Sequence, residues 1–147
     1  MRDLDPITPD SLRIRPGELV VLGAPWEGGS SYLPGTAAGP ARIREALRSP
    51  ARSLVTEAGE NLDRDDRLRI LGDLHLTATA QCAETLERTA DRILDGRARF
   101  LALGGDHSIT VGLVRAVGRH IPDLTLVQID AHPDLYEEFD GDRWSHA

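Results

Sequence analysis

The feature that most constrains the fold is a series of short, continuous apolar runs, each closed by glycine or a polar residue and separated by longer segments. Runs of this kind are typical of strands that are covered on both faces, as in a parallel sheet. The expected strands are residues 18–23, 68–73, 99–103 and 124–129. In such sheets ligands collect beyond the carboxyl ends of the strands, so the loops that follow these runs are where chemistry is expected.

Between the expected strands, apolar residues recur at helical spacing in 41–48, 80–94 and 109–120. Pro40 suits the first turn of the first helix, Thr79 is placed to cap the second, and Gly96 to end it. Strands that alternate with helices favour right-handed crossovers and a mainly parallel sheet. The sequence therefore predicts a three-layer α/β/α domain.

Length and composition indicate one domain with a real core, because the chain has 147 residues of which 40% are hydrophobic. Residues 1–17 are polar and hold three of the nine prolines, which suggests a surface arm. The globular portion is expected to span 18–147.

Charge and cysteine content narrow the partners and the compartment. The formal net charge is −7, so an attraction for nucleic acid or for an anionic membrane is not expected, and a small cationic partner fits better. Cys82 is the single cysteine, which rules out an intramolecular disulfide and favours a reducing, cytoplasmic setting. The start of the sequence carries acidic residues and prolines and is not expected to act as a secretory signal, and no apolar run approaches membrane-spanning length.

Three metal-ligand side chains follow the last expected strand: Asp130, His132 and Asp134. Because Asp130 and His132 are two residues apart in an extended segment, their side chains are expected on the same face. Pro133 restricts the backbone and lets Asp134 turn back toward the same centre. The spacing predicts three ligands for one metal site.

A fourth candidate ligand, His107, ends the neighbouring expected strand in the turn GGDHS, where two glycines allow a sharp bend. Imidazole and carboxylate together suit manganese, iron or zinc, whereas calcium prefers oxygen ligands. Asp73 and His75 also follow a strand, but no partner carboxylate lies near them in sequence. The glycine-rich loop 23–39 has neither a P-loop ending nor a GxGxxG spacing, which argues against nucleotide binding.

These residues resemble a known family. GGDHS at 104–108 and DAHPD at 130–134 are similar to metal-binding signatures of the ureohydrolases, which include arginase and agmatinase. The resemblance extends to 23–44, to 72–76 and to 135–147, and the last stretch is most similar to agmatinases.

The resemblance implies two manganese ions that activate water for attack on a guanidinium carbon, with release of urea and an amine. Agmatine, hydrolysed to putrescine in polyamine biosynthesis, is the expected substrate, and a homo-oligomer is expected for the full-length form. The implied roles are as follows: His107 and Asp134 bind one ion, His132 binds the other, Asp130 bridges both, and His146 shuttles protons. Asp106 is not a ligand in that pattern and is expected to orient neighbouring groups.

The sequence also departs from the family pattern. It lacks a later aspartate-rich strand segment (SxDxDxxDP-like) and a still later glutamate. Two divalent ions bring four positive charges, whereas Asp130 and Asp134 return only two. We therefore expect the chain to correspond to the N-terminal half of a family member, with an incomplete α/β domain, and to be inactive alone.

Several alternatives stay open at this stage. The substrate could be arginine or another guanidino or formimino compound. A zinc deacetylase-like hydrolase also places Asp-Ala-His at a strand end, although GGDHS and the lack of adjacent histidines argue against it. A non-catalytic fragment that binds full-length subunits is the third alternative.

Overall fold

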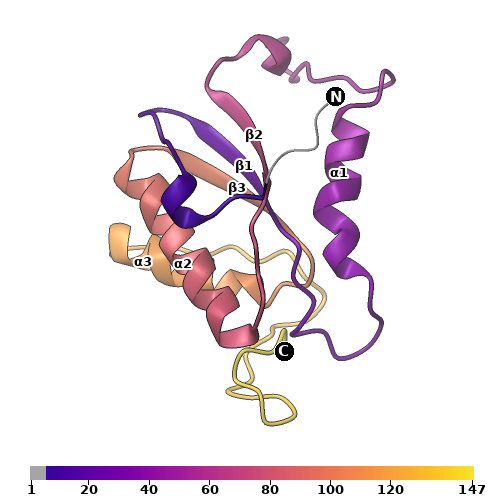
Figure 1. Ribbon diagram of the computed structural model, residues 1–147, viewed down its shortest axis with the longest axis vertical. Helices are drawn as coiled ribbons and strands as arrows, with labels where there is room; N and C mark the ends of the chain where they lie inside the picture. The colour runs from indigo at the N-terminus through magenta and orange to yellow at the C-terminus, as the bar shows by residue number, and fades with distance from the viewer. Residues whose placement is uncertain (1–5) are drawn as a thin grey trace.

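The computed structural model describes residues 6–147 and shows an α/β fold built on a three-stranded sheet (Figure 1). The strands are β1 (Leu19–Ala24), β2 (Leu68–Asp73) and β3 (Arg99–Gly104), in the order β2-β1-β3. Both pairings are parallel. The α-helices are α1 (Gly39–Leu47), α2 (Thr79–Asp95) and α3 (Ile109–His120), and three short 3-10 helices lie at Pro9–Ser11, Thr36–Ala38 and Leu62–Arg64.

The three strands and the three α-helices lie within two residues of the predicted ones, with two corrections. Helix α2 has Ala78 as its N-cap, so Thr79 is its first residue and not its cap, whereas Gly96 ends it as expected. The strand predicted at 124–129 does not form, as described below. Among residues 6–147, no helix combines the length and the apolar character needed to cross a membrane.

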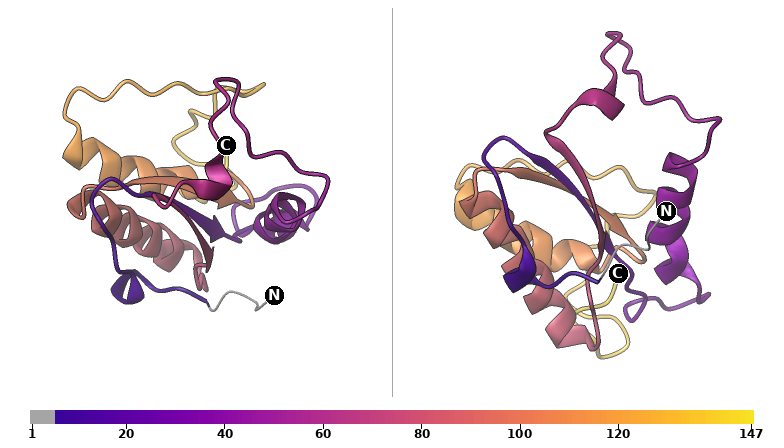
Figure 2. Two further views of the ribbon diagram at one scale, coloured as in Figure 1. Left: turned by 90° about the horizontal axis from the view of Figure 1, so that it is seen from above. Right: turned by 45° about the horizontal axis from the view of Figure 1, so that its top comes forward.

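The main core lies on one face of β1. Val20, Leu22 and Ala24 alternate along the strand and pack in a cluster with Leu86 and Ile93 of α2. The helices α2 and α3 lie side by side on this side of the sheet, and α1 lies away from them (Figure 2).

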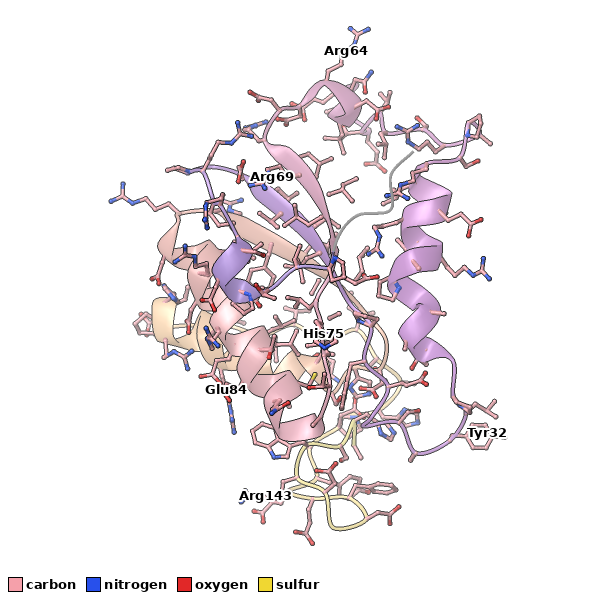
Figure 3. All side chains as sticks on the ribbon, in the orientation of Figure 1. Tyr32, Arg64, Arg69, His75, Glu84 and Arg143 are labelled. Atoms are coloured by element: carbon pink, nitrogen blue, oxygen red, sulfur yellow. The ribbon has the colours of Figure 1, made fainter. Side chains whose placement is uncertain are left out.

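Helix α1 is fixed to the other face of the sheet by an ion pair. Nη1 and Nη2 of Arg44 donate to Oδ1 and Oδ2 of the Asp73 carboxylate at the end of β2, each at 2.6 Å. The facing position on β1 is Gly23, where a Cβ would lie 1.7 Å from Asp73 Oδ1. Asp73, a weak candidate ligand in the sequence, is therefore the anchor of α1, and His75 beyond it is exposed (Figure 3).

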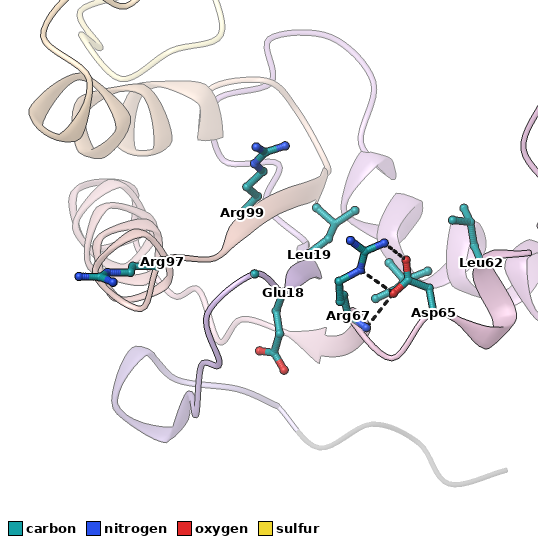
Figure 4. A pocket seen from close by; sticks show the side chains of 9 residues that line it. Glu18, Leu19, Leu62, Asp65, Arg67, Arg97 and Arg99 are labelled. Atoms are coloured by element: carbon teal, nitrogen blue, oxygen red, sulfur yellow. Dashed lines mark hydrogen bonds and ion pairs between the residues drawn. The ribbon is translucent and has the colours of Figure 1, made fainter. Parts of the chain in front are cut away.

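A second set of ion pairs lies at the amino ends of the strands. Figure 4 shows the pocket there, with Glu18 and the Arg67–Asp65 ion pair among the residues that line it. The Glu18 side chain is buried and accepts from Arg15 Nε at 2.5 Å and from Arg69 Nη1 at 2.8 Å. Burial alone raises the pKa of Glu18, but the Arg15 backbone N–H and the two guanidinium groups outweigh it and lower the pKa to about 2.

We expect Glu18 to make the free energy of unfolding depend on pH in the acidic range. Since its pKa is lower in the folded chain than in the unfolded chain, its contribution is full above pH 4.5 and is lost as the pH falls toward 2. Glu18→Gln should cost on the order of 2 kcal/mol at pH 6 and much less at pH 3. Urea denaturation of both proteins at the two pH values measures this difference, and an equal cost at both would contradict it.

Candidate metal centre

The turn after β3 is held against the loop that follows β1. Asp106 N donates to Trp26 O at 2.8 Å, and Gly105 N donates to Ala24 O at 3.2 Å. A Cβ on Gly105 would lie 1.9 Å from Trp26 O, so this close approach requires glycine. The turn places the imidazole of His107 just before α3, partly exposed to solvent.

The segment 124–129 was predicted to be a strand, and this prediction is wrong for the described structure. The segment forms no ladder with β3, and its apolar side chains Leu126, Val127 and Ile129 are exposed, Ile129 by 98%. An apolar run indicates that burial of its side chains is favourable, but it does not specify which segment covers them. A strand forms only where another backbone supplies its hydrogen bonds.

The structure brings together three of the four predicted ligands. One ligand atom each from His107, Asp130 and Asp134 lies within 4.8 Å of the others. The chain bends at residues 130–132, and Asp134 itself has φ 48°, a left-handed conformation that aspartate tolerates better than most residues. Gln128 Nε2 donates to Asp134 Oδ2 at 2.7 Å and holds this carboxylate.

The remaining predicted ligand, His132, does not join the cluster of His107, Asp130 and Asp134. Its side chain is 79% exposed, and its Nδ1 lies 3.7 Å from Asp130 Oδ1. The expected shared face required an extended backbone from Asp130 to His132, but this segment bends, and His132 N donates to Asp130 Oδ1 at 3.0 Å. This backbone hydrogen bond is the main reason that the pKa of Asp130 is lowered, with a further contribution from His107.

The predicted proton shuttle, His146, lies beside the cluster. Its ring makes an edge contact with the His107 ring, with centroids 5.6 Å apart. Both rings border a pocket of about 500 Å³ between α3 and residues 126–136. Arg143, which lies on the same C-terminal loop as His146 (Figure 3), also lines this pocket.

Sequence reasoning missed one contributor to the site, Gln128, and the long-range partner of another, Asp106. Gln128 precedes Asp130 by two residues, and this spacing could have suggested a polar partner. Asp106 was expected to orient neighbouring groups, and the structure shows its carboxylate accepting from Gly29 N and Ser108 N, each at 3.0 Å. Nothing local predicted the contact with Gly29.

Known proteins are similar to this chain in sequence and in fold. The model of the arginase family matches residues 17–147. A mitochondrial arginase from Medicago truncatula is 38% identical over 137 residues, which cover 86% of this chain and 40% of that protein. An agmatinase from Bacillus anthracis is 33% identical over 135 residues, which cover 88% of this chain and 45% of the agmatinase.

The structure of the arginase from Medicago truncatula superposes with a TM-score of 0.80 at 33% identity, over 88% of this chain and 44% of the arginase. The chain thus spans less than half the length of these relatives. The family match includes every residue of the candidate centre. This chain belongs to the arginase family.

Proposed function

We propose that residues 17–147 form part of a metal-dependent hydrolase that cleaves a guanidino C–N bond to give urea and an amine. The observation that carries the proposal is the convergence of His107, Asp130 and Asp134 beside the ring of His146. Membership of the arginase family supports the reaction class.

The donors fit a divalent ion. Two carboxylates supply two negative charges, and one imidazole completes a mixed oxygen and nitrogen set that suits manganese, iron or zinc. We propose manganese, with His107, Asp130 and Asp134 holding one ion. His132, next to Asp130, is proposed as a ligand to a second ion.

The proposed reaction assigns a different role to each group of residues in the site. Bound divalent ions supply a Lewis acid that lowers the pKa of water. The carboxylates of Asp130 and Asp134 would hold the ion, and Leu126 and Leu135 provide an apolar wall of the pocket that a guanidino substrate would enter. The ring of His146, which contacts the ring of His107, is proposed to give a proton to the leaving amine.

Agmatine is the proposed substrate, and this choice rests on the likeness of residues 135–147 to agmatinases. Arginine is the second candidate. The exposed carboxylates Glu137, Glu138 and Asp140 add negative charge near the pocket and favour cationic guanidines generally.

The proposal can be tested on the manganese-loaded 147-residue chain by water-proton relaxation, which reports water on bound Mn²⁺. We expect agmatine to lower the relaxation enhancement, while 1,4-diaminobutane, which lacks the guanidino group, leaves it almost unchanged. Urea release from agmatine and arginine is measured in the same samples. We expect this chain alone to bind agmatine but to release little urea, because the two carboxylates among its three donors balance the charge of only one divalent ion.

Two results would count against the proposal. The first is equal responses to agmatine and 1,4-diaminobutane, which would show that the guanidino group is not recognised. The second is hydrolysis of an acetylated amine without any response to guanidines, which would favour the deacetylase alternative.

A further inference from the structure

Three segments far apart in sequence meet at Gly29, in the loop after β1. Gly29 N donates to Asp106 Oδ2 at 3.0 Å. Gly29 O accepts from His146 Nδ1 at 2.5 Å, and more weakly from His146 N at 3.4 Å. One residue therefore connects the turn after β3 to the proposed proton shuttle.

This junction has no room for a side chain. A Cβ on Gly29 would lie 2.7 Å from both Cβ and Oγ of Ser108, and 3.3 Å from Asp106 Oδ1. The first distance is shorter than real Cβ contacts, and Ser108 lies at the start of α3, where it cannot move freely. The close approach thus depends on glycine at this position.

The carboxylate of Asp106 is itself fixed. Its side chain is buried, and its Oδ1 accepts from both the backbone N–H and the hydroxyl of Ser108. Within residues 6–147 its hydrogen bonds go to Ser108 and Gly29, and none goes to the ring of His107. Asp106 therefore acts on the loop that carries Gly29 and not directly on a proposed metal ligand.

The contact with Gly29 determines the tautomer of His146. A carbonyl oxygen can only accept, so Nδ1 of His146 must carry the hydrogen. In the neutral ring Nε2 is then the atom with the free lone pair, and it lies 3.3 Å from Ser31 Oγ. The neighbouring loop thus sets both the orientation of the ring and the nitrogen that can exchange a proton.

We propose that Asp106 is a positioning residue that acts through Gly29 to hold His146 as its Nδ1–H tautomer. The use of this ring in proton transfer rests on the proposed function. The tautomer itself does not, so it can be tested without turnover.

The test is long-range ¹H–¹⁵N correlation NMR of the His146 ring in the 147-residue chain without manganese, at a pH where the ring is neutral. In the unmodified chain we expect a protonated Nδ1 and an unprotonated Nε2. In Asp106→Ala we expect the two nitrogen shifts to move toward each other as both tautomers become populated. Asp106→Asn should restore most of the original pattern, because its amide oxygen can accept from Gly29 N.

Two further variants separate positioning from a general disturbance of the turn. Ser108→Ala removes one bond to Asp106 but leaves the bond to Gly29, so the His146 shifts should stay as in the unmodified chain. Gly29→Ala should mimic Asp106→Ala, because it displaces the same loop from the other side. Circular dichroism checks that each variant is folded.

The proposal is overturned if folded Asp106→Ala leaves the His146 shifts unchanged, or if Ser108→Ala moves them as much. A failure of the hydrolase proposal would show instead in the relaxation and urea measurements, with the His146 shifts unaffected. The two proposals can therefore fail separately.

Discussion

Asp73→Ala is expected to lower the free energy of unfolding by about 3 kcal/mol, one of the largest effects of any single change in this chain. The cost arises because Arg44, only 7% exposed, would lose the partner of its charge. We place the effect at the low end for buried pairs because the Asp73 side chain is 32% exposed. Chemical denaturation followed by circular dichroism measures it.

The matched control lies on the same helix. Arg42 and Glu45 form an ion pair in which both side chains are exposed, so Glu45→Ala should cost less than about 1 kcal/mol. The double variant Arg44→Met/Asp73→Leu should recover much of the lost stability, because it leaves no buried charge. If Asp73→Ala costs no more than Glu45→Ala, the pair does not anchor α1.

The second large effect concerns metal affinity. His107→Ala and Asp134→Ala should each weaken Mn²⁺ binding by about 100-fold or more, since each removes one of the three proposed ligands. Gln128→Ala should weaken it by roughly 10-fold, the usual scale for a group that orients a ligand. Isothermal titration calorimetry of the four proteins gives this ranking.

Two other histidines serve as controls for that ranking. His120→Ala should have no effect on Mn²⁺ affinity, because His120 pairs with Asp91 at the far end of α3. His132→Ala should weaken the first ion less than Asp134→Ala does, because its ring lies outside the cluster. An equal loss in His132→Ala and Asp134→Ala would show that the described position of His132 is not the one that binds metal.

Local patterns predicted much of this fold. The strand 68–73 and the helix 109–120 have the bounds that their apolar spacing indicates, because burial on one or both faces leaves a clear period in the sequence. The segment 124–129 has the same apolar pattern but does not form a strand. Strand formation depends on hydrogen bonds to a neighbouring strand, and the local sequence does not specify that neighbour.

The site divides in the same way. The signatures around His107 and Asp130 marked the residues that converge, whereas the bend at His132 depends on backbone geometry that spacing cannot supply. The Arg44–Asp73 pair joins residues 29 apart, and the Gly29–Asp106 bond joins residues 77 apart. Contacts over such separations follow from the fold and could not be read from either segment alone.

The most direct test of the metal centre is pulsed EPR of Mn²⁺ bound to the 147-residue chain carrying His132→Ala, which removes the proposed ligand of a second ion, with each further substitution made in that background. The described cluster predicts ¹⁴N coupling from a directly bound imidazole, which disappears in His107→Ala and persists in His120→Ala. Bound Mn²⁺ without nitrogen coupling, or with coupling that survives His107→Ala, would contradict the assignment of His107, Asp130 and Asp134 as its ligands.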